Sequence, residues 1–179
     1  MTKFFYDTEY LDDGVTLSFI SIGIVREDGA TYYAVNADAD WNRIHQHNWL
    51  MANVVPRLPP AAGWKPKQLI ADEVGAFLLG SGKPALWGWF AAYDHVVLSQ
   101  LFGRMLDMPP GIPMFTNDLR SLIDLAGIRL LPEQTSGNHD ALEDAKHLKV
   151  RFDYVEAQMA SRRIEAKVPL TPLEGPTDA

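Results

Sequence analysis

The stretch over residues 3–36 decides the fold, with KFFYDTEY at 3–10, TLSFISIGIVR at 16–26 and ATYYAVN at 30–36. All three runs are rich in β-branched and aromatic residues. The turn sequences Asp12-Asp13-Gly14 and Glu27-Asp28-Gly29 separate them. Short turns between such runs predict three antiparallel strands in a meander.

The rest of the chain shows helical patterns and one further strand. A helix is predicted to start at Pro66, where apolar residues begin to recur every three or four positions, and to end at Gly80-Ser81-Gly82. PALWGWF at 84–90 is predicted as a strand, and further helices are predicted at 41–50, 93–106, from a Thr116 cap to 126, and 140–163. This order predicts an α/β fold, in which helices pack on a mixed sheet made of the meander and a parallel strand.

Length and composition restrict the class of protein. The 179 residues fit one domain, predicted at 1–163, followed by a loose tail at 164–179 that contains three prolines. The chain has no cysteine, which excludes disulfides, thiolate nucleophiles and zinc fingers. Any metal must therefore be held by carboxylates, histidines or carbonyls, the ligands of hard cations.

The charge balance bears on possible partners. A formal charge of −7 and a pI near 5.1 make a long phosphate backbone a poor partner, although the protein could grip one nucleic-acid end through bound cations. No segment reaches the ~20 apolar residues of a membrane span. The N-terminus turns acidic by Asp7, unlike a secretory signal. We therefore expect a cytoplasmic protein without a membrane segment.

Two carboxylates close the first predicted strand. Asp7 and Glu9 stand at i and i+2, so they point to the same face. Two solvated charges beside a turn would be the simpler interpretation. A first strand flanked by partners is normally central, however, and charges there are costly unless a cation neutralises them.

Two later clusters lie at predicted helix starts. Asp94 follows the strand at 84–90 and opens a helix, where stabilisation by the helix dipole is the simpler explanation. In the run from Asn138 to Ala145, Asp140 and Glu143 have capping-box spacing. That spacing places His139 just outside the helix and Asp144 in its first turn, so His139 is either a mobile base or a staple of the helix start.

The three clusters occur in an order that resembles a known family. Asp-x-Glu at a strand end, a middle Asp, and a late His followed five residues on by Asp are similar to the DEDD exonuclease superfamily, the RNase T and DnaQ-like group, in its His-containing branch. The runs FYDTE at 5–9, ISIG at 20–23, WGW at 87–89, AYDH at 92–95 and HDAL at 139–142 resemble the polyadenylate-specific exoribonucleases known as RNase AS.

The resemblance implies an RNase H-like fold and removal of 5′-mononucleotides from the 3′ end of RNA, with a preference for adenylate, using two Mg²⁺ or Mn²⁺ ions. Asp7, Glu9, Asp94 and Asp144 match the metal-binding carboxylates of the family, and His139 matches its general base. It also implies a homodimer. Phe90 stands where the wider group usually has Asn.

Other motifs give weaker indications. Tyr10 and Leu11 follow the Asp-x-Glu and are predicted to touch a terminal base. Trp87 and Trp89 fit core packing better than base stacking. A phosphate loop at residues 80–83 and a metal site at His45 and His47 are both disfavoured. The alternatives to an exoribonuclease are a proofreading-type DNA exonuclease and a catalytically silent nucleic-acid-binding module.

Overall fold

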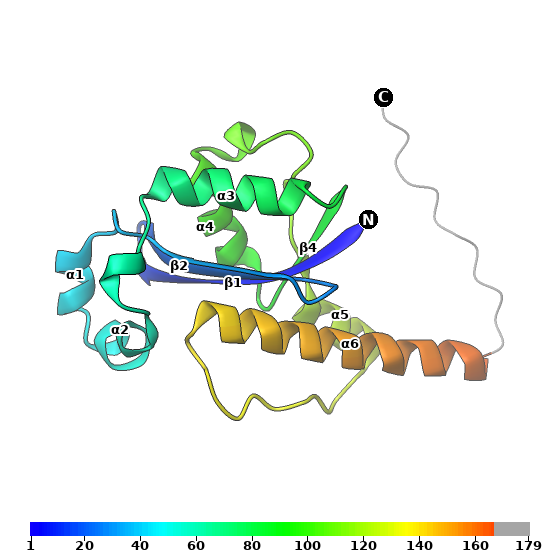
Figure 1. Ribbon diagram of the computed structural model, residues 1–179. Coiled ribbons are helices and arrows are strands. Elements are labelled where there is room, and N and C mark those ends of the chain that lie inside the picture. Colours follow the sequence, from blue (N-terminus) through cyan, green and yellow to red (C-terminus); the bar gives the residue numbers. More distant parts are fainter. Residues whose placement is uncertain (167–179) are drawn as a thin grey trace.

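The computed structural model describes residues 1–166, and its central element is a five-stranded sheet in the order β3-β2-β1-β4-β5 (Figure 1). β1 (Thr2–Asp12), β2 (Leu17–Arg26) and β3 (Thr31–Val35) form the predicted antiparallel meander. β4 (Pro84–Gly88) lies parallel to β1 on its other side. The mixed α/β sheet with helices packed on it is therefore confirmed, and its arrangement is consistent with an RNase H-like fold.

The fifth strand, β5 (Asn117–Asp118), was not predicted. The expected Thr116 cap of the following helix is wrong, because Asp118 caps α5 (Leu119–Ala126) by accepting a hydrogen bond from the Ser121 N–H. The Thr116 hydroxyl is instead shared between the Tyr6 hydroxyl, at 2.7 Å, and the Nδ1 atom of His95, at 3.0 Å.

Two layers of helices cover the two faces of the sheet (Figure 1). α3 (Lys67–Leu79) and α4 (Ala92–Phe102) pack on one face, and α5 and α6 (Ala141–Ala166) pack on the other. Side-chain alternation along β1 supplies both cores. Phe4 and Tyr6 point into the first, and Phe5 points into the second.

A helical arm between β3 and α3 covers one end of the sheet. Its elements are α1 (Trp41–Gln46), α2 (Asn48–Asn53), and the 3₁₀ turns η1 (Val55–Arg57) and η2 (Ala61–Gly63). The single helix predicted at 41–50 is wrong. The chain is extended at His47, whose Nδ1 accepts from the Leu50 N–H and starts α2 anew.

Helix boundaries differ from the predictions where the termination signal is local. α4 ends at Phe102 instead of 106, since Gly103 has a φ of 123° and is followed by the 3₁₀ turn η3 (Met105–Asp107). α3 starts after Pro66 and ends at Gly80, as predicted. α6 extends to Ala166, and the rest of the predicted tail, 167–179, lies outside the described residues. No helix within 1–166 is long and apolar enough to cross a bilayer.

Candidate active site

The first pair of carboxylates comes from the central strand. Asp7 and Glu9 lie on the same face of β1 as Phe5, the face that α6 covers. Glu9 is buried and Asp7 is partly buried. The pairing of β1 with β2 shifts register between Glu9 and Tyr10, so the strand is irregular where the pair ends.

The third carboxylate reaches the pair from α4. Asp94 is buried in the first turn of this helix, and its Oδ1 accepts two hydrogen bonds from Thr8. The Thr8 backbone N–H donates at 2.9 Å and its hydroxyl at 2.6 Å. The Oδ1 atom of Asp94 is thus held toward β1 by Thr8. Stabilisation by the helix dipole, the simpler explanation from the sequence, does not account for these two hydrogen bonds.

The fourth carboxylate and the histidine come from the start of α6. Asp140 is the N-cap, as predicted, because its Oδ1 accepts from the N–H groups of Leu142 and Glu143. The reciprocal bond of a capping box is absent, since the Asp140 N–H donates to Gly137. Asp144 accepts from the His139 N–H at 2.9 Å and from Gln134 Nε2 at 2.6 Å.

Backbone conformation at the site is unusual at two places. Within residues 1–166, His139 and Phe90 are the non-glycine residues with positive φ, at 65° and 53°. Such conformations cost on the order of 1 kcal/mol or more and concentrate at functional sites. Both residues line the same cleft beside the carboxylates.

Burial and mutual repulsion perturb the carboxyl groups. Desolvation, followed by repulsion from Asp94 and Glu9, raises the pKa of Asp7 well above its usual value. Desolvation and the charge of Asp144 raise the pKa of Glu9 to about 8, and desolvation raises the pKa of Asp94 to about 6. Desolvation also raises the pKa of Asp144. The four carboxyl groups therefore lack enough neighbouring positive charge to favour their ionised forms.

The donor set fits a hard divalent cation. Among residues 1–166, one group of three potential ligands has donor atoms within 4.8 Å of one another, namely Glu9, His139 and Asp144. Carboxylate oxygens suit Mg²⁺ and Mn²⁺. The raised pKa values of Asp7 and Glu9 are what such a site shows before a cation neutralises it.

Two pockets flank the carboxylates. The arm pocket, of about 490 Å³, is bounded by Tyr10, Tyr93, His47 and Trp49, and the loop pocket, of about 470 Å³, is bounded by Gln134, His147 and Arg151. Asp7, Trp89, His139 and Asp144 line both pockets. The site therefore lies at the junction of two adjoining cavities.

The two residues predicted to touch a terminal base, Tyr10 and Leu11, lie in different surroundings. Tyr10 lines the arm pocket and stacks on Tyr93, with ring centroids 6.1 Å apart and an interplanar angle of 8°. Leu11 is buried in the core beneath the arm and lines neither pocket. Trp87 packs against Phe152 in the core, whereas Trp89 lines both pockets.

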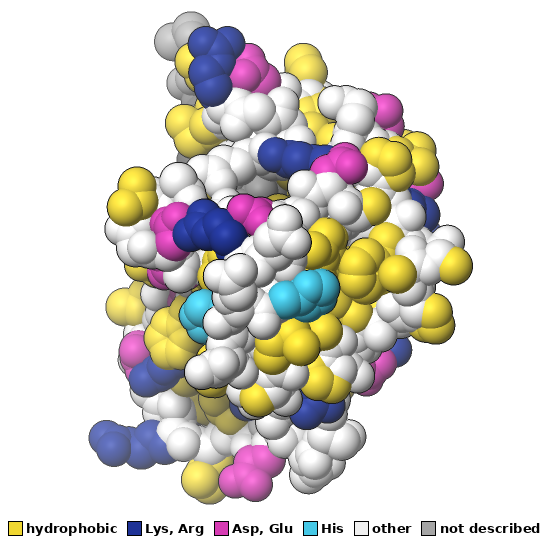
Figure 2. Space-filling model, turned by 90° about the vertical axis from the view of Figure 1, so that its left-hand side faces the viewer, with side chains coloured by type: hydrophobic (Ala, Val, Ile, Leu, Met, Phe, Trp, Pro, Cys, Tyr) yellow, Lys and Arg dark blue, Asp and Glu magenta, His cyan; other side chains and the backbone are white. Residues whose placement is uncertain are grey.

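Trp49 is a site residue that the sequence did not reveal. Its ring lies edge-on to the His139 ring, with centroids 4.8 Å apart at 78°. It comes from the arm, where no periodic pattern marks it. Figure 2 views this end of the molecule, where histidine side chains lie among hydrophobic ones.

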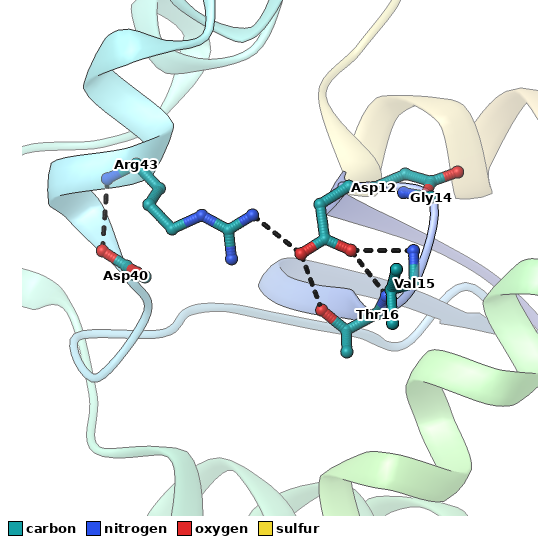
Figure 3. Close-up of polar contacts among 7 residues, drawn as sticks. Asp12, Gly14, Val15, Thr16, Asp40 and Arg43 are labelled. Carbon is teal, nitrogen blue, oxygen red and sulfur yellow. Dashed lines mark hydrogen bonds and ion pairs between the residues drawn. The ribbon is translucent and has the colours of Figure 1, made fainter.

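A polar contact anchors the arm to the sheet (Figure 3). Arg43 of α1 donates to Asp13 Oδ2 at 2.7 Å, and Asp13 also accepts from the Val15 and Thr16 N–H groups in the β1–β2 turn. These bonds hold the pKa of Asp13 well below its usual value. Asp40 caps α1 by accepting from the Arg43 N–H.

Comparison with known proteins identifies the family of this chain. The family model described as the 3′-5′ exoribonuclease Rv2179c-like domain matches residues 2–155. Two curated relatives from Mycobacterium tuberculosis are each 43% identical over 154 residues, covering 84% of this chain and 90% of the relative. They are the 3′-5′ exoribonuclease Rv2179c of strain H37Rv and the 3′-5′ exoribonuclease MT2234.1 of strain CDC 1551. The matched region contains all the carboxylates and the histidine described above, and the chain belongs to the family of Rv2179c-like 3′-5′ exoribonuclease domains.

Proposed function

We propose that this protein is a divalent-metal-dependent 3′-5′ exoribonuclease of the DEDD superfamily, in its His-containing branch and of the RNase AS type. The observation that carries the proposal is the convergence of Asp7, Glu9, Asp94 and Asp144 on one cleft beside His139, where the pKa of each of these four carboxyl groups is raised. Relatives 43% identical are named 3′-5′ exoribonucleases, which supports the same reaction here.

The carboxylates are assigned to two Mg²⁺ or Mn²⁺ ions. Asp7 would bridge them, Glu9 and Asp144 would hold the ion on the side of the attacking water, and Asp94 would hold the other. Bound ions of this kind supply Lewis acidity at a phosphodiester and stabilise the attacking and leaving oxygens. Thr8 orients Asp94, and Gln134 orients Asp144.

His139 is assigned as the general base. An imidazole nitrogen takes a proton from the attacking water, whose oxygen bonds to phosphorus while the bond from phosphorus to the leaving 3′ oxygen breaks. The leaving oxygen takes up a proton and departs as the 3′-OH of the shortened RNA, and a 5′-mononucleotide is released. Asp144 fixes the His139 backbone and Trp49 packs against its ring, so both hold the base at the cluster.

The arm pocket is assigned to the terminal nucleotide. Tyr10, Tyr93 and Trp49 present aromatic surface beside the carboxylates, which suits base stacking. We extend the proposal to adenylate preference and to a homodimer, both by the resemblance of the sequence to RNase AS, and to the cytoplasmic location expected above.

A digestion panel tests the proposal. Labelled RNA and DNA oligomers, each ending in a different 3′ base, are incubated with the protein in Mg²⁺, Mn²⁺ or EDTA. We expect 5′-mononucleotides from RNA with either metal, fastest for terminal adenylates, and none in EDTA. Faster digestion of DNA would favour a proofreading-type enzyme, and binding without cleavage would indicate a silent module.

A further inference from the structure

Arg151 is a positively charged residue that lines the loop pocket, and the reaction proposed above gives it no role. It follows Asp144 by seven residues on α6, which is about two turns and about 10 Å along the helix axis on nearly the same face. Its guanidinium lies over the ring of Trp89, with the Cζ atom 4.5 Å from the ring centroid. Trp89 in turn lines the cavity shared with Asp7.

The Arg151 guanidinium is fixed in place, but only part of its hydrogen-bonding capacity is used. Its Nε–H donates to the Pro132 carbonyl at 3.3 Å, and the Nε2–H of His147 donates to the same oxygen at 3.1 Å. Within the part of the chain that the structure describes, the terminal amino groups of Arg151 have no hydrogen-bond partner and the side chain has no ion pair. Glu133 lines the same pocket without pairing to it.

Charge divides the cleft into two sides. Among the described residues that line the arm pocket, none is Lys or Arg. The loop pocket contains Arg151, and a third pocket beyond Trp89 is lined by Arg129 and by Arg120, which pairs with Asp124 of the same pocket. Trp89 borders all three pockets. Positive charge thus lies on the α5–α6 side of the carboxylates, in a protein whose net charge is −7.

We propose that Arg151, held on Trp89, binds the backbone phosphate next upstream of the scissile one, so that the loop pocket takes the penultimate nucleotide of the RNA. The inference rests on the proposed exoribonuclease function and adds the direction in which the RNA runs across the cleft. The terminal nucleotide lies in the arm pocket, and the body of the strand leaves past Trp89 toward Arg129.

The chemistry of the pocket favours this ligand. A guanidinium presents planar donors that match two phosphate oxygens, and stacking on an aromatic ring fixes its plane in advance. The Pro132 carbonyl takes only the Nε–H, which leaves the outer edge of the fork for an anion. A lysine here would keep the charge but lose the stacking and the paired donors.

Two dinucleotides separate upstream binding from catalysis. One carries a free 5′-OH and has only the scissile phosphate, and the other carries a 5′-phosphate at the upstream position. We expect the wild-type protein to hydrolyse both, with a KM about tenfold or more lower for the 5′-phosphorylated form, as for hydrogen bonds to a charged group. Arg151→Gln should remove this preference, and Arg151→Lys should restore part of it.

A second readout is the salt dependence of binding to a longer RNA. Loss of one phosphate contact should reduce the slope of log affinity against log salt by about 0.7 for a single strand. Arg104→Gln is the matched control, because Arg104 is exposed, pairs with Asp107 and lines neither pocket of the site. This variant should keep the dinucleotide preference and the salt slope.

The outcomes distinguish the inference from the function on which it rests. If the wild-type protein hydrolyses neither dinucleotide nor longer RNA, the exoribonuclease proposal fails. If it hydrolyses both dinucleotides and Arg151→Gln keeps the preference for the 5′-phosphate, the upstream site is wrong. An equal loss on both dinucleotides, at an unchanged melting temperature in Arg151→Gln and Arg151→Lys, would also overturn it.

Discussion

Gly23 of β2 lies so close to Ala141 at the start of α6 that a methyl group on Gly23 would come within 2.3 Å of the Ala141 carbonyl oxygen. In the sheet, Gly23 is also the partner of Asp7 across the β1–β2 pair. The missing side chain therefore lets the helix end that carries His139 and Asp144 rest directly on the strand beside Asp7. The distance from Asp7 on β1 to His139 and Asp144 at the start of α6 therefore depends on this contact.

Gly23→Ala should accordingly disturb stability and activity together. Backbone atoms of Ala141 and Leu142 form the contact, so no side chain can turn away to make room. We expect a loss of about 1–3 kcal/mol in unfolding free energy from overpacking, and a fall in kcat/KM of up to about 100-fold from displacement of the catalytic groups. Gly63→Ala is the control, since nothing lies within 4 Å of its added methyl group. A Gly23→Ala enzyme of wild-type rate would contradict the tight placement of α6.

Thr8→Val tests whether the orientation of Asp94 matters. The substitution removes the 2.6 Å hydroxyl bond to Oδ1 but keeps the shape of the side chain and the backbone bond. We expect the metal concentration for half-maximal activity to rise about 10–100-fold, as for other residues that orient a metal ligand. Thr31→Val, at an exposed position of β3, is the control. An unchanged metal requirement would show that the Thr8 hydroxyl does not orient Asp94 for metal binding.

His139→Ala should reduce kcat by about 10²–10⁴, the usual contribution of a positioned base. Binding of Mn²⁺ and RNA should persist, because the carboxylates remain. The competing explanation is that the His139 side chain only staples the start of α6 by packing its ring against Trp49. In that case the melting temperature should fall while the single-turnover rate stays near wild type, so both quantities are measured on the same preparation.

Stability without metal should depend on pH in a defined direction. The raised pKa values mean that the folded protein keeps protons which the unfolded chain releases, so stability in EDTA should fall as pH rises from about 4 toward 8. Asp7→Asn should flatten this fall and raise the melting temperature at pH 8, while abolishing hydrolysis. Asp72→Asn, on the exposed side of α3, is the control. A wild-type melting temperature that climbs over this range would be inconsistent with repulsion at the cluster.

The sequence predicted the parts of the site that depend on local spacing. The i, i+2 relation of Asp7 and Glu9 places them on one face of a strand, and the Asp140 cap fixes where α6 begins. Both are properties of a few adjacent residues. The strands of the meander were equally predictable, because tight turns join them.

The remaining parts depend on contacts between distant segments. Trp49 meets His139 across ninety positions of sequence, and the arm that carries it shows no clear periodicity. β5 is two residues long and is defined by its pairing with β4. Thr116 has the residue type of a helix cap, yet Tyr6 and His95 engage its hydroxyl. Only the folded chain brings these partners together.

The most direct test of the central claim is product analysis from one linear RNA with a free 3′-OH and a labelled 5′ end. With Mg²⁺, the wild-type protein should shorten the labelled strand one nucleotide at a time from the 3′ end and release 5′-mononucleotides. Asp7→Asn with Mg²⁺, and the wild-type protein in excess EDTA, should leave the strand intact. Shortening in EDTA, full activity of Asp7→Asn, or rapid internal cleavage of the same sequence as a circle would contradict a metal-dependent 3′-5′ exoribonuclease at this site.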